Sequence, residues 1–110
     1  MQENHKICRI ISELTLFILE HISGNINVDV KEEQNKYIIK IVTDEFNLES
    51  LNFIKKRLIA DRNYSIEEYG WELVGEGDSD DDLELIGSLV DEASIINENG
   101  KTIITLVRGQ

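Results

Sequence analysis

The residues whose types and spacing could most readily do chemistry are the carboxylates of one short stretch. Asp78, Asp80 and Asp82 occupy alternate positions, and alternate carboxylates in a tight turn can converge on one hard cation such as calcium. A calcium loop also requires a glycine at its sixth position and a glutamate at its twelfth. This chain has Leu83 and Leu89 there. The stretch is therefore a weak candidate for a divalent-cation site, and no dedicated metal site is expected.

The charge of the chain limits its partners. It carries 22 acidic and 11 basic residues, a formal net charge of −11, which opposes binding to nucleic acid or to an anionic membrane. Residues 63–100 contain twelve of the acids and no Lys, Arg or His. Two interpretations remain open for this region: a solvated acidic surface, or a docking surface for a protein partner with a basic face. The candidate partner-binding residues are Asp80, Asp81, Asp82 and Glu84.

Length and composition predict a single domain over residues 1–110. Hydrophobic residues make up 41% and charged residues 30%, which argues against disorder, and no apolar run approaches the roughly 18 residues of a membrane helix. The first six residues lack the layout of a secretory signal. The one cysteine, Cys8, excludes an internal disulfide and fits a reducing compartment. We therefore expect a cytoplasmic protein.

Apolar spacing predicts two helices in the first half of the chain. Leu16 and Leu19 lie off the main stripe of the first helix, so cover on a second face is one alternative, and Gly24 is the expected cap at its end. Asn47 is the expected N-cap of the second helix. The main stripe of the first helix comprises Ile7, Ile10, Ile11, Leu14, Phe17, Ile18 and Ile22, and that of the second comprises Leu48, Leu51, Ile54 and Leu58.

The remaining segments predict strands and one more helix. Alternation favours strands around residues 26–30 and 37–41, with residues 31–36 as the turn between them. A short strand over 71–74, a helix over 82–92 and two strands over 93–96 and 102–107 follow, the last two joined at Asn99-Gly100. The predicted fold class is α+β: a two-layer sandwich with a mostly antiparallel, mixed sheet of four to five strands and about three helices on one face.

This order and the segments 85–93 (LIGSLVDEA) and 99–106 (NGKTIITL) resemble the GHKL (Bergerat-fold) ATP-binding domain of histidine-kinase-like ATPases. The resemblance covers about residues 7–107 and is closest to bacterial anti-sigma-factor serine kinases. It implies that Glu13 matches the family's catalytic glutamate, whereas Phe17 stands where an asparagine should help to hold magnesium. It also implies that Asp44 matches the aspartate that reads adenine.

The same resemblance predicts a loss of nucleotide binding. Phe46 and Leu48 stand where the family's second motif has glycines, and Asp80 and Asp82 stand where its third motif has them. A helix N-terminus attracts phosphate, but carboxylates there repel a triphosphate by a few kcal/mol each at contact distance. We therefore expect neither ATP nor magnesium as a cofactor.

Three functions remain open at this point. The favoured one is a non-catalytic regulatory or protein-interaction module on a degenerate ATPase fold, in a sigma-factor or two-component circuit. The alternatives are an active serine kinase or ATPase with Glu13 as its catalytic residue and Asp44 on the nucleotide, and an acidic-loop cation-binding protein. The residues favour a protein without enzymatic activity but do not decide it. A protein partner is expected, and the oligomeric state is open, with a homodimer as one alternative.

Overall fold

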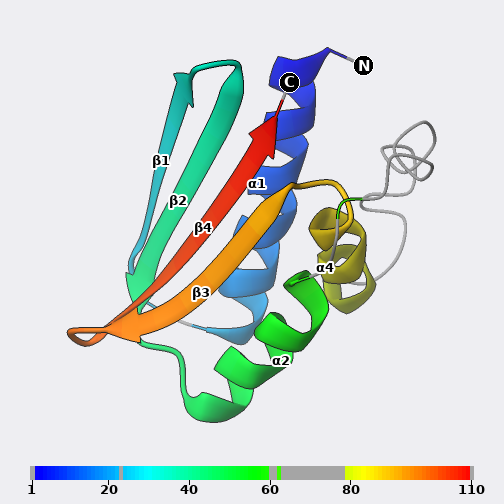
Figure 1. Ribbon diagram of the computed structural model, residues 1–110. Helices are drawn as coiled ribbons and strands as arrows, with labels where there is room; N and C mark the ends of the chain where they lie inside the picture. The colour runs from blue at the N-terminus through cyan, green and yellow to red at the C-terminus, as the bar shows by residue number, and fades with distance from the viewer. Residues whose placement is uncertain (1, 23, 60–61, 63–78, 110) are drawn as a thin grey trace.

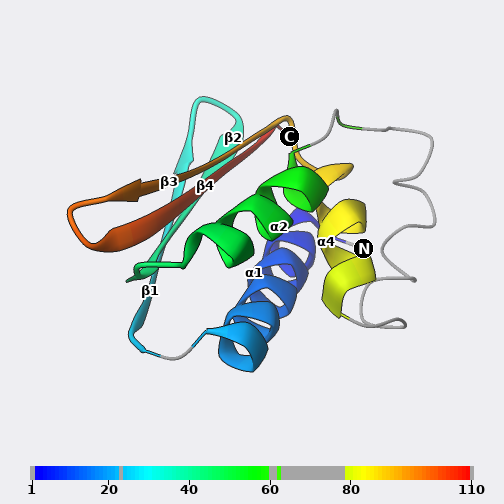
Figure 2. The ribbon, with the colours of Figure 1, turned by 90° about the horizontal axis from the view of Figure 1, so that it is seen from below.

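The computed structural model describes residues 2–22, 24–59, 62 and 79–109, with the backbone only of 79–82. These residues form a four-stranded antiparallel sheet with three helices on one of its faces (Figures 1 and 2). The predicted α+β class is therefore confirmed. The strand predicted over 71–74 lies outside the described residues. Within the described residues, no helix is long and apolar enough to cross a membrane.

Helix α1 (Glu3–His21) follows the predicted apolar stripe. Its buried residues recur three or four positions apart, which places them on one side of the helix against the core. Leu16 and Leu19 remain 44% and 66% exposed, so nothing described covers a second face of the helix. The helix ends at an extended Ile22, before the predicted glycine cap. The buried residues of α1 are Ile7, Ile10, Leu14, Phe17 and Ile18.

Helix α2 (Leu48–Leu58) begins where the sequence predicts. The side chain of Asn47 accepts a hydrogen bond from the backbone N–H of Ser50 at 2.8 Å, which satisfies one of the free amides of the first turn. Leu51 and two later residues of the stripe are buried, but Leu48 is 72% exposed. The predicted burial of Leu48 was wrong. This residue is the first of the helix, and the side chains of α2 that are buried in the core begin with Leu51.

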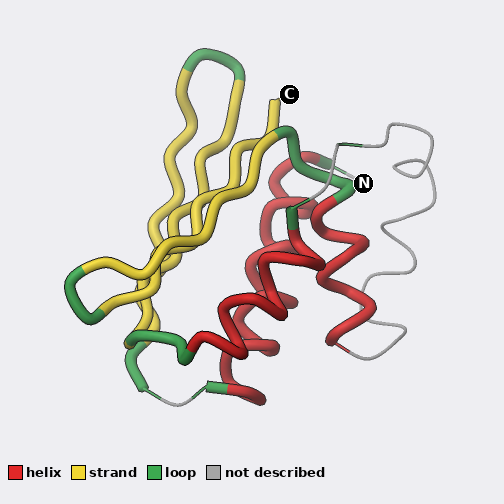
Figure 3. The backbone as a smooth tube through the Cα atoms, turned by 60° about the horizontal axis from the view of Figure 1, so that its bottom comes forward, coloured by secondary structure: helices red, strands yellow, loops and turns green. Residues whose placement is uncertain are grey.

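The four strands form two hairpins: β1 (Ile26–Glu33) with β2 (Lys36–Asp44), and β3 (Glu92–Glu98) with β4 (Lys101–Gly109). Each hairpin has a two-residue turn with positive φ at both positions, at Gln34-Asn35 and at Asn99-Gly100. Such turns match the twist of the strands they join. The first turn is therefore much shorter than the predicted 31–36. The two turns lie at opposite ends of the sheet (Figure 3).

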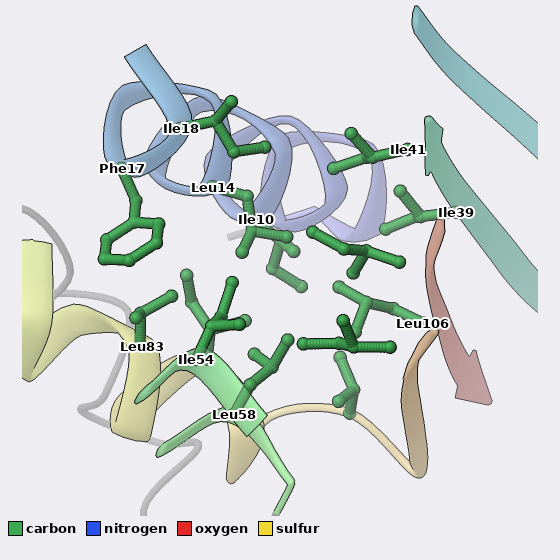
Figure 4. Packing of buried hydrophobic residues seen from close by; sticks show 14 of the residues in the cluster. Ile10, Leu14, Phe17, Ile18, Ile39, Ile41, Ile54, Leu58, Leu83 and Leu106 are labelled. Carbon is green, nitrogen blue, oxygen red and sulfur yellow. The ribbon is translucent and has the colours of Figure 1, made fainter. Parts of the chain in front are cut away.

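Strand order β1-β2-β4-β3 places both hairpins side by side through β2 and β4. Alternate residues of β2 and β4 point to the helices and are almost fully buried, among them Ile39, Ile41, Ile104 and Leu106. They meet apolar side chains of α1 and α2, and Leu83, in one core (Figure 4). Strand β1 lies at the edge of the sheet, away from this core, and seven of its eight residues are exposed.

Helix α4 (Ser79–Gly87) begins and ends a few residues before the predicted 82–92. Gly87 explains how the end of this helix packs. A Cβ at this position would lie 2.2 Å from the carbonyl oxygen of Leu58, so only glycine allows the ends of α4 and α2 to approach this closely. Leu89 and Val90 follow the helix and are still fully buried.

Candidate functional site

A hollow of about 240 Å³ lies between the end of α1 and the start of α2. Helix α1 supplies Phe17 and His21, and the first turns of α2 supply Glu49, Ser50 and Phe53. The volume is below the roughly 300–1,000 Å³ of typical small-molecule sites. It is the natural place to look for the chemistry predicted on α1.

Aromatic packing dominates this hollow. The rings of Phe17 and His21 stack with centroids 4.3 Å apart, and those of Phe17 and Phe53 lie parallel at 6.0 Å. The guanidinium of Arg57 lies 3.7 Å from the centroid of Phe53, a cation–π contact. The ring nitrogen Nδ1 of His21 hydrogen-bonds the carbonyl oxygen of Phe17 at 3.0 Å. His21 thus links the end of the helix to the aromatic cluster.

Phe17 is 1% exposed and belongs to the core. Its phenyl ring fills the position at which the resemblance requires an oxygen ligand, and a hydrocarbon ring cannot coordinate a hard cation. Glu13 is half-buried, one helical turn before Phe17 on the same side of α1. The residues that line the hollow do not include it.

Asp44 lies at the end of β2 and joins three segments of the chain. One carboxylate oxygen accepts a hydrogen bond from the backbone N–H of Asn25 at 3.2 Å. The other oxygen accepts one from Nζ of Lys101 at 3.0 Å. The Lys101 hydrogen bond, followed by that of Asn25, holds the pKa of the Asp44 carboxyl below its ordinary value.

Glycine at position 24 makes this arrangement sterically accessible. Gly24 has a φ of +130°, and a Cβ there would lie 2.1 Å from Asp44 Oδ2. Asp44 therefore acts as a structural clamp between the α1–β1 connection and β4. Asp44 does not cap α2, because Asn47 is the capping residue.

The acidic candidates fall at the start of α4. Asp78 lies outside the described residues, and the backbone of Asp80, Asp81 and Asp82 is helical. Carboxylates in a first helical turn are stabilised by the helix dipole, and Glu84, one turn later, is exposed. Among the residues whose side chains are described, no group of three His, Cys, Asp or Glu could hold a metal ion.

The second face of the sheet is a surface that the motif search missed. We call it the open face, because none of the described helices lies over it (Figure 2). By strand register and alternation its central positions alternate between apolar and polar residues. The signal in the sequence was an apolar residue at every fourth position of β2 and β4. These positions alternate along the strands with the residues that point into the core. The apolar residues of the open face are Ile38, Val42, Ile96, Ile103 and Val107.

The comparisons with known proteins leave the family open. No protein-family model, curated protein sequence or solved structure matches the chain. The fold and the described side chains are therefore the basis for any functional conclusion.

Proposed function

We propose that the protein is a non-catalytic protein-interaction module that works in the cytoplasm and binds through the open face of its sheet. The observation that carries this proposal is the apolar content of that face. Ile96 is 49% exposed, and four further aliphatic side chains lie half-buried on the same face, in two groups separated by Lys40 and Thr105, with no described element above them. Apolar surface that stays exposed on one face is typical of interaction sites.

Two residues at the positions of the family's nucleotide motifs support the same proposal. Phe17 is part of the core, and both oxygens of Asp44 hold other parts of the chain. A nucleotide that recruited Asp44 would have to share carboxylate oxygens that already accept from the backbone N–H of Asn25 and from the ammonium of Lys101. The resemblance to GHKL domains adds the proposal that the module belongs to a regulatory circuit of the sigma-factor or two-component type.

Site-specific photo-crosslinking tests the proposal. A photoreactive amino acid replaces Ile103 on the open face or, as a matched control, Leu16, which is 44% exposed on the far side of α1. We expect protein crosslinks in cells from position 103 and few or none from position 16. Equal yields from both positions, or no crosslink from position 103, would contradict the assignment of the binding surface.

A nucleotide titration tests the non-catalytic part of the proposal. Millimolar MgATP should leave the thermal unfolding temperature unchanged, because a ligand raises it only when it binds the folded state. A saturable increase that disappears in the Asp44→Asn variant would instead favour the nucleotide-binding alternative.

A further inference from the structure

We infer that the partner of the open face is a second copy of this chain, packed face to face across a two-fold axis parallel to the strands between β2 and β4. This inference rests on the proposed function and specifies the partner. It follows from the charge of the open face and from the register of the four strands.

The open face differs from the rest of the surface in its charge. It carries four lysines and five carboxylates, a net charge of −1, although the whole chain carries −11. Nearly all of the repulsion between two copies therefore comes from other surfaces. Like-charged surfaces suppress association and nearly neutral mixed surfaces permit it. The charged residues of the open face are Asp29, Lys31, Glu33, Lys36, Lys40, Asp44, Glu92, Glu98 and Lys101.

Strand pairing arranges the centre of the open face in four rows across the sheet. Each row takes one residue from each strand, in the order β1, β2, β4, β3. Two rows with an apolar centre lie on either side of a polar row that contains Lys40. The rows are Lys31-Ile38-Val107-Glu92, Asp29-Lys40-Thr105-Ser94, Asn27-Val42-Ile103-Ile96 and, beyond the end of β1, Asp44-Lys101-Glu98.

A two-fold axis along the strands makes these rows complementary to themselves. It places β1 of one copy over β3 of the other and β2 over β4, and it leaves every row facing its own counterpart. In the first row Lys31 then faces Glu92 of the second copy, and Ile38 faces Val107 of the second copy.

The other rows behave similarly under this axis. In the third row Val42 faces Ile103 of the second copy, so the apolar centre of each outer row meets an apolar centre. In the fourth row Asp44 and Lys101, which pair within the chain at 3.0 Å, meet the same pair in reverse order. Two positions are not matched: Asn27 lies opposite Ile96 of the second copy, and Glu98 lies opposite the place beyond the end of β1, where there is no strand residue.

An axis across the strands is disfavoured by the same residues. If it runs along the polar row, it sets Lys40 against Lys40 of the second copy. Two ammonium groups in contact would repel each other in a partly desolvated interface. The facing residues therefore select the axis along the strands. Either axis would leave the strands of the two sheets aligned, as they commonly are in packed sheets within about 30°.

The size of the surface indicates a reversible dimer. Four strands at about 4.8 Å spacing and nine residues at about 3.3 Å rise give each copy a contact area on the order of 500–600 Å². A standard interface buries about 800 Å² per partner. We therefore expect a dimer that dissociates on dilution and that strengthens with salt, because salt screens the repulsion between the two acidic copies.

A charge-swap series measured by sedimentation equilibrium tests the inference. Lys31→Glu should weaken the dimer about tenfold or more, since the two-fold axis turns both Lys31–Glu92 contacts into repulsions. Adding Glu92→Lys should restore most of the affinity. Within one chain these residues lie on opposite edge strands, roughly 14 Å apart at three strand spacings, so restoration would arise between copies. Both positions are exposed, and equal unfolding midpoints of all variants at a concentration at which the wild type is monomeric provide the folding control.

The outcomes separate the inference from the proposed function. A wild-type chain that remains monomeric at every concentration overturns the inference, yet crosslinks from position 103 to another protein would still support an interaction module. If Lys31→Glu leaves the dimer affinity unchanged, or if adding Glu92→Lys does not restore it, the proposed face-to-face arrangement is overturned. Loss of position-103 crosslinks together with a monomeric chain would overturn both.

Discussion

The two faces of one sheet use the same strands for different purposes. Ile39 points to the helices and is fully buried, whereas its neighbour Ile38 points to the open face and is half-buried. On β4, Leu106 and Val107 show the same contrast. The covered face provides the core of the fold, and the open face presents further apolar side chains that remain partly exposed. An antiparallel sheet can remain solvated on one side, so aliphatic residues at the centre of that side are consistent with the proposed binding surface.

The charged groups differ between the faces as well. The covered face buries Arg108, which is 1% exposed. Its Nε and Nη2 donate to the two carboxylate oxygens of Glu3 at 3.1 and 3.0 Å, and its Nη1 donates to the carbonyl oxygen of Leu89. On the open face, Lys101 and Asp44 remain largely in water, with side chains 48% and 43% exposed. The covered face holds its charge in three hydrogen bonds, and the open face keeps its charged pair partly in water.

The largest expected effect comes from truncation on each face of β2. Ile39→Ala should lower the free energy of unfolding by about 2–5 kcal/mol, because it leaves a cavity in the core. Ile38→Ala, the matched control on the same strand, should cost about 1 kcal/mol or less. Urea unfolding of the two variants measures the difference. Equal losses would show that the open face is also covered in the folded protein.

The next effect concerns the two basic residues of β4. Arg108→Met should destabilise the protein by about 1–3 kcal/mol, because the buried carbonyl oxygen of Leu89 and the carboxylate of Glu3 lose their donor. Lys101→Met on the open face should change stability by less than about 1 kcal/mol, since exposed ion pairs contribute little. Chemical denaturation of both variants provides the readout. A larger loss for Lys101→Met would reverse the proposed roles of the two faces.

A pH series isolates the contribution of Glu3. Hydrogen bonding to Arg108 holds the pKa of Glu3 below its ordinary value of 4.5. The stabilisation is therefore complete above the unfolded-state pKa and is lost as pH falls through the lowered folded-state pKa. Wild type should exceed Glu3→Gln in stability at pH 7, and this advantage should disappear as the pH falls below about 4.5. An advantage that persists in strong acid would exclude the Glu3 carboxylate as its source.

The smallest effect is expected at Asp44. Asp44→Asn removes the charge that pairs with Lys101 but retains an oxygen that can accept from the backbone N–H of Asn25. Because the pair is exposed and screened, the change in thermal unfolding should stay close to the error of the measurement. A loss as large as that of Arg108→Met would instead assign Asp44 a central role in the fold.

Local patterns in the sequence predicted the elements well. The apolar spacing of α1, the Asn47 cap and the Asn99-Gly100 turn each depend on a few neighbouring residues, and the structure confirms them. The packing of an element against residues distant in sequence was harder to predict. Gly87, the last residue of α4, lies against the backbone of Leu58, and no local pattern indicates that contact.

The site was harder to predict than the fold. Motif reasoning selected Glu13 and Asp44 as single residues, but the partners of Asp44 are 19 and 57 positions away. The open face was equally difficult to identify, because its apolar positions become one surface only when β2 and β4 pair in a defined register. Burial of Leu48 was predicted from the helical period of apolar residues alone. That period does not reveal which turn of the helix is the first to pack into the core.

Zero-length carbodiimide coupling between copies tests the central claim most directly. Equal amounts of ¹⁴N- and ¹⁵N-labelled protein are mixed, coupled and digested, and the linked peptides are identified by mass spectrometry. The open-face dimer predicts an amide bond between Lys31 and Glu92, in a product of twice the 12.6 kDa chain mass, with half of the linked pairs carrying one label of each kind. Lys31 coupled only within its own chain, or a product of 12.6 kDa alone, would contradict the assignment of the open face to a second copy.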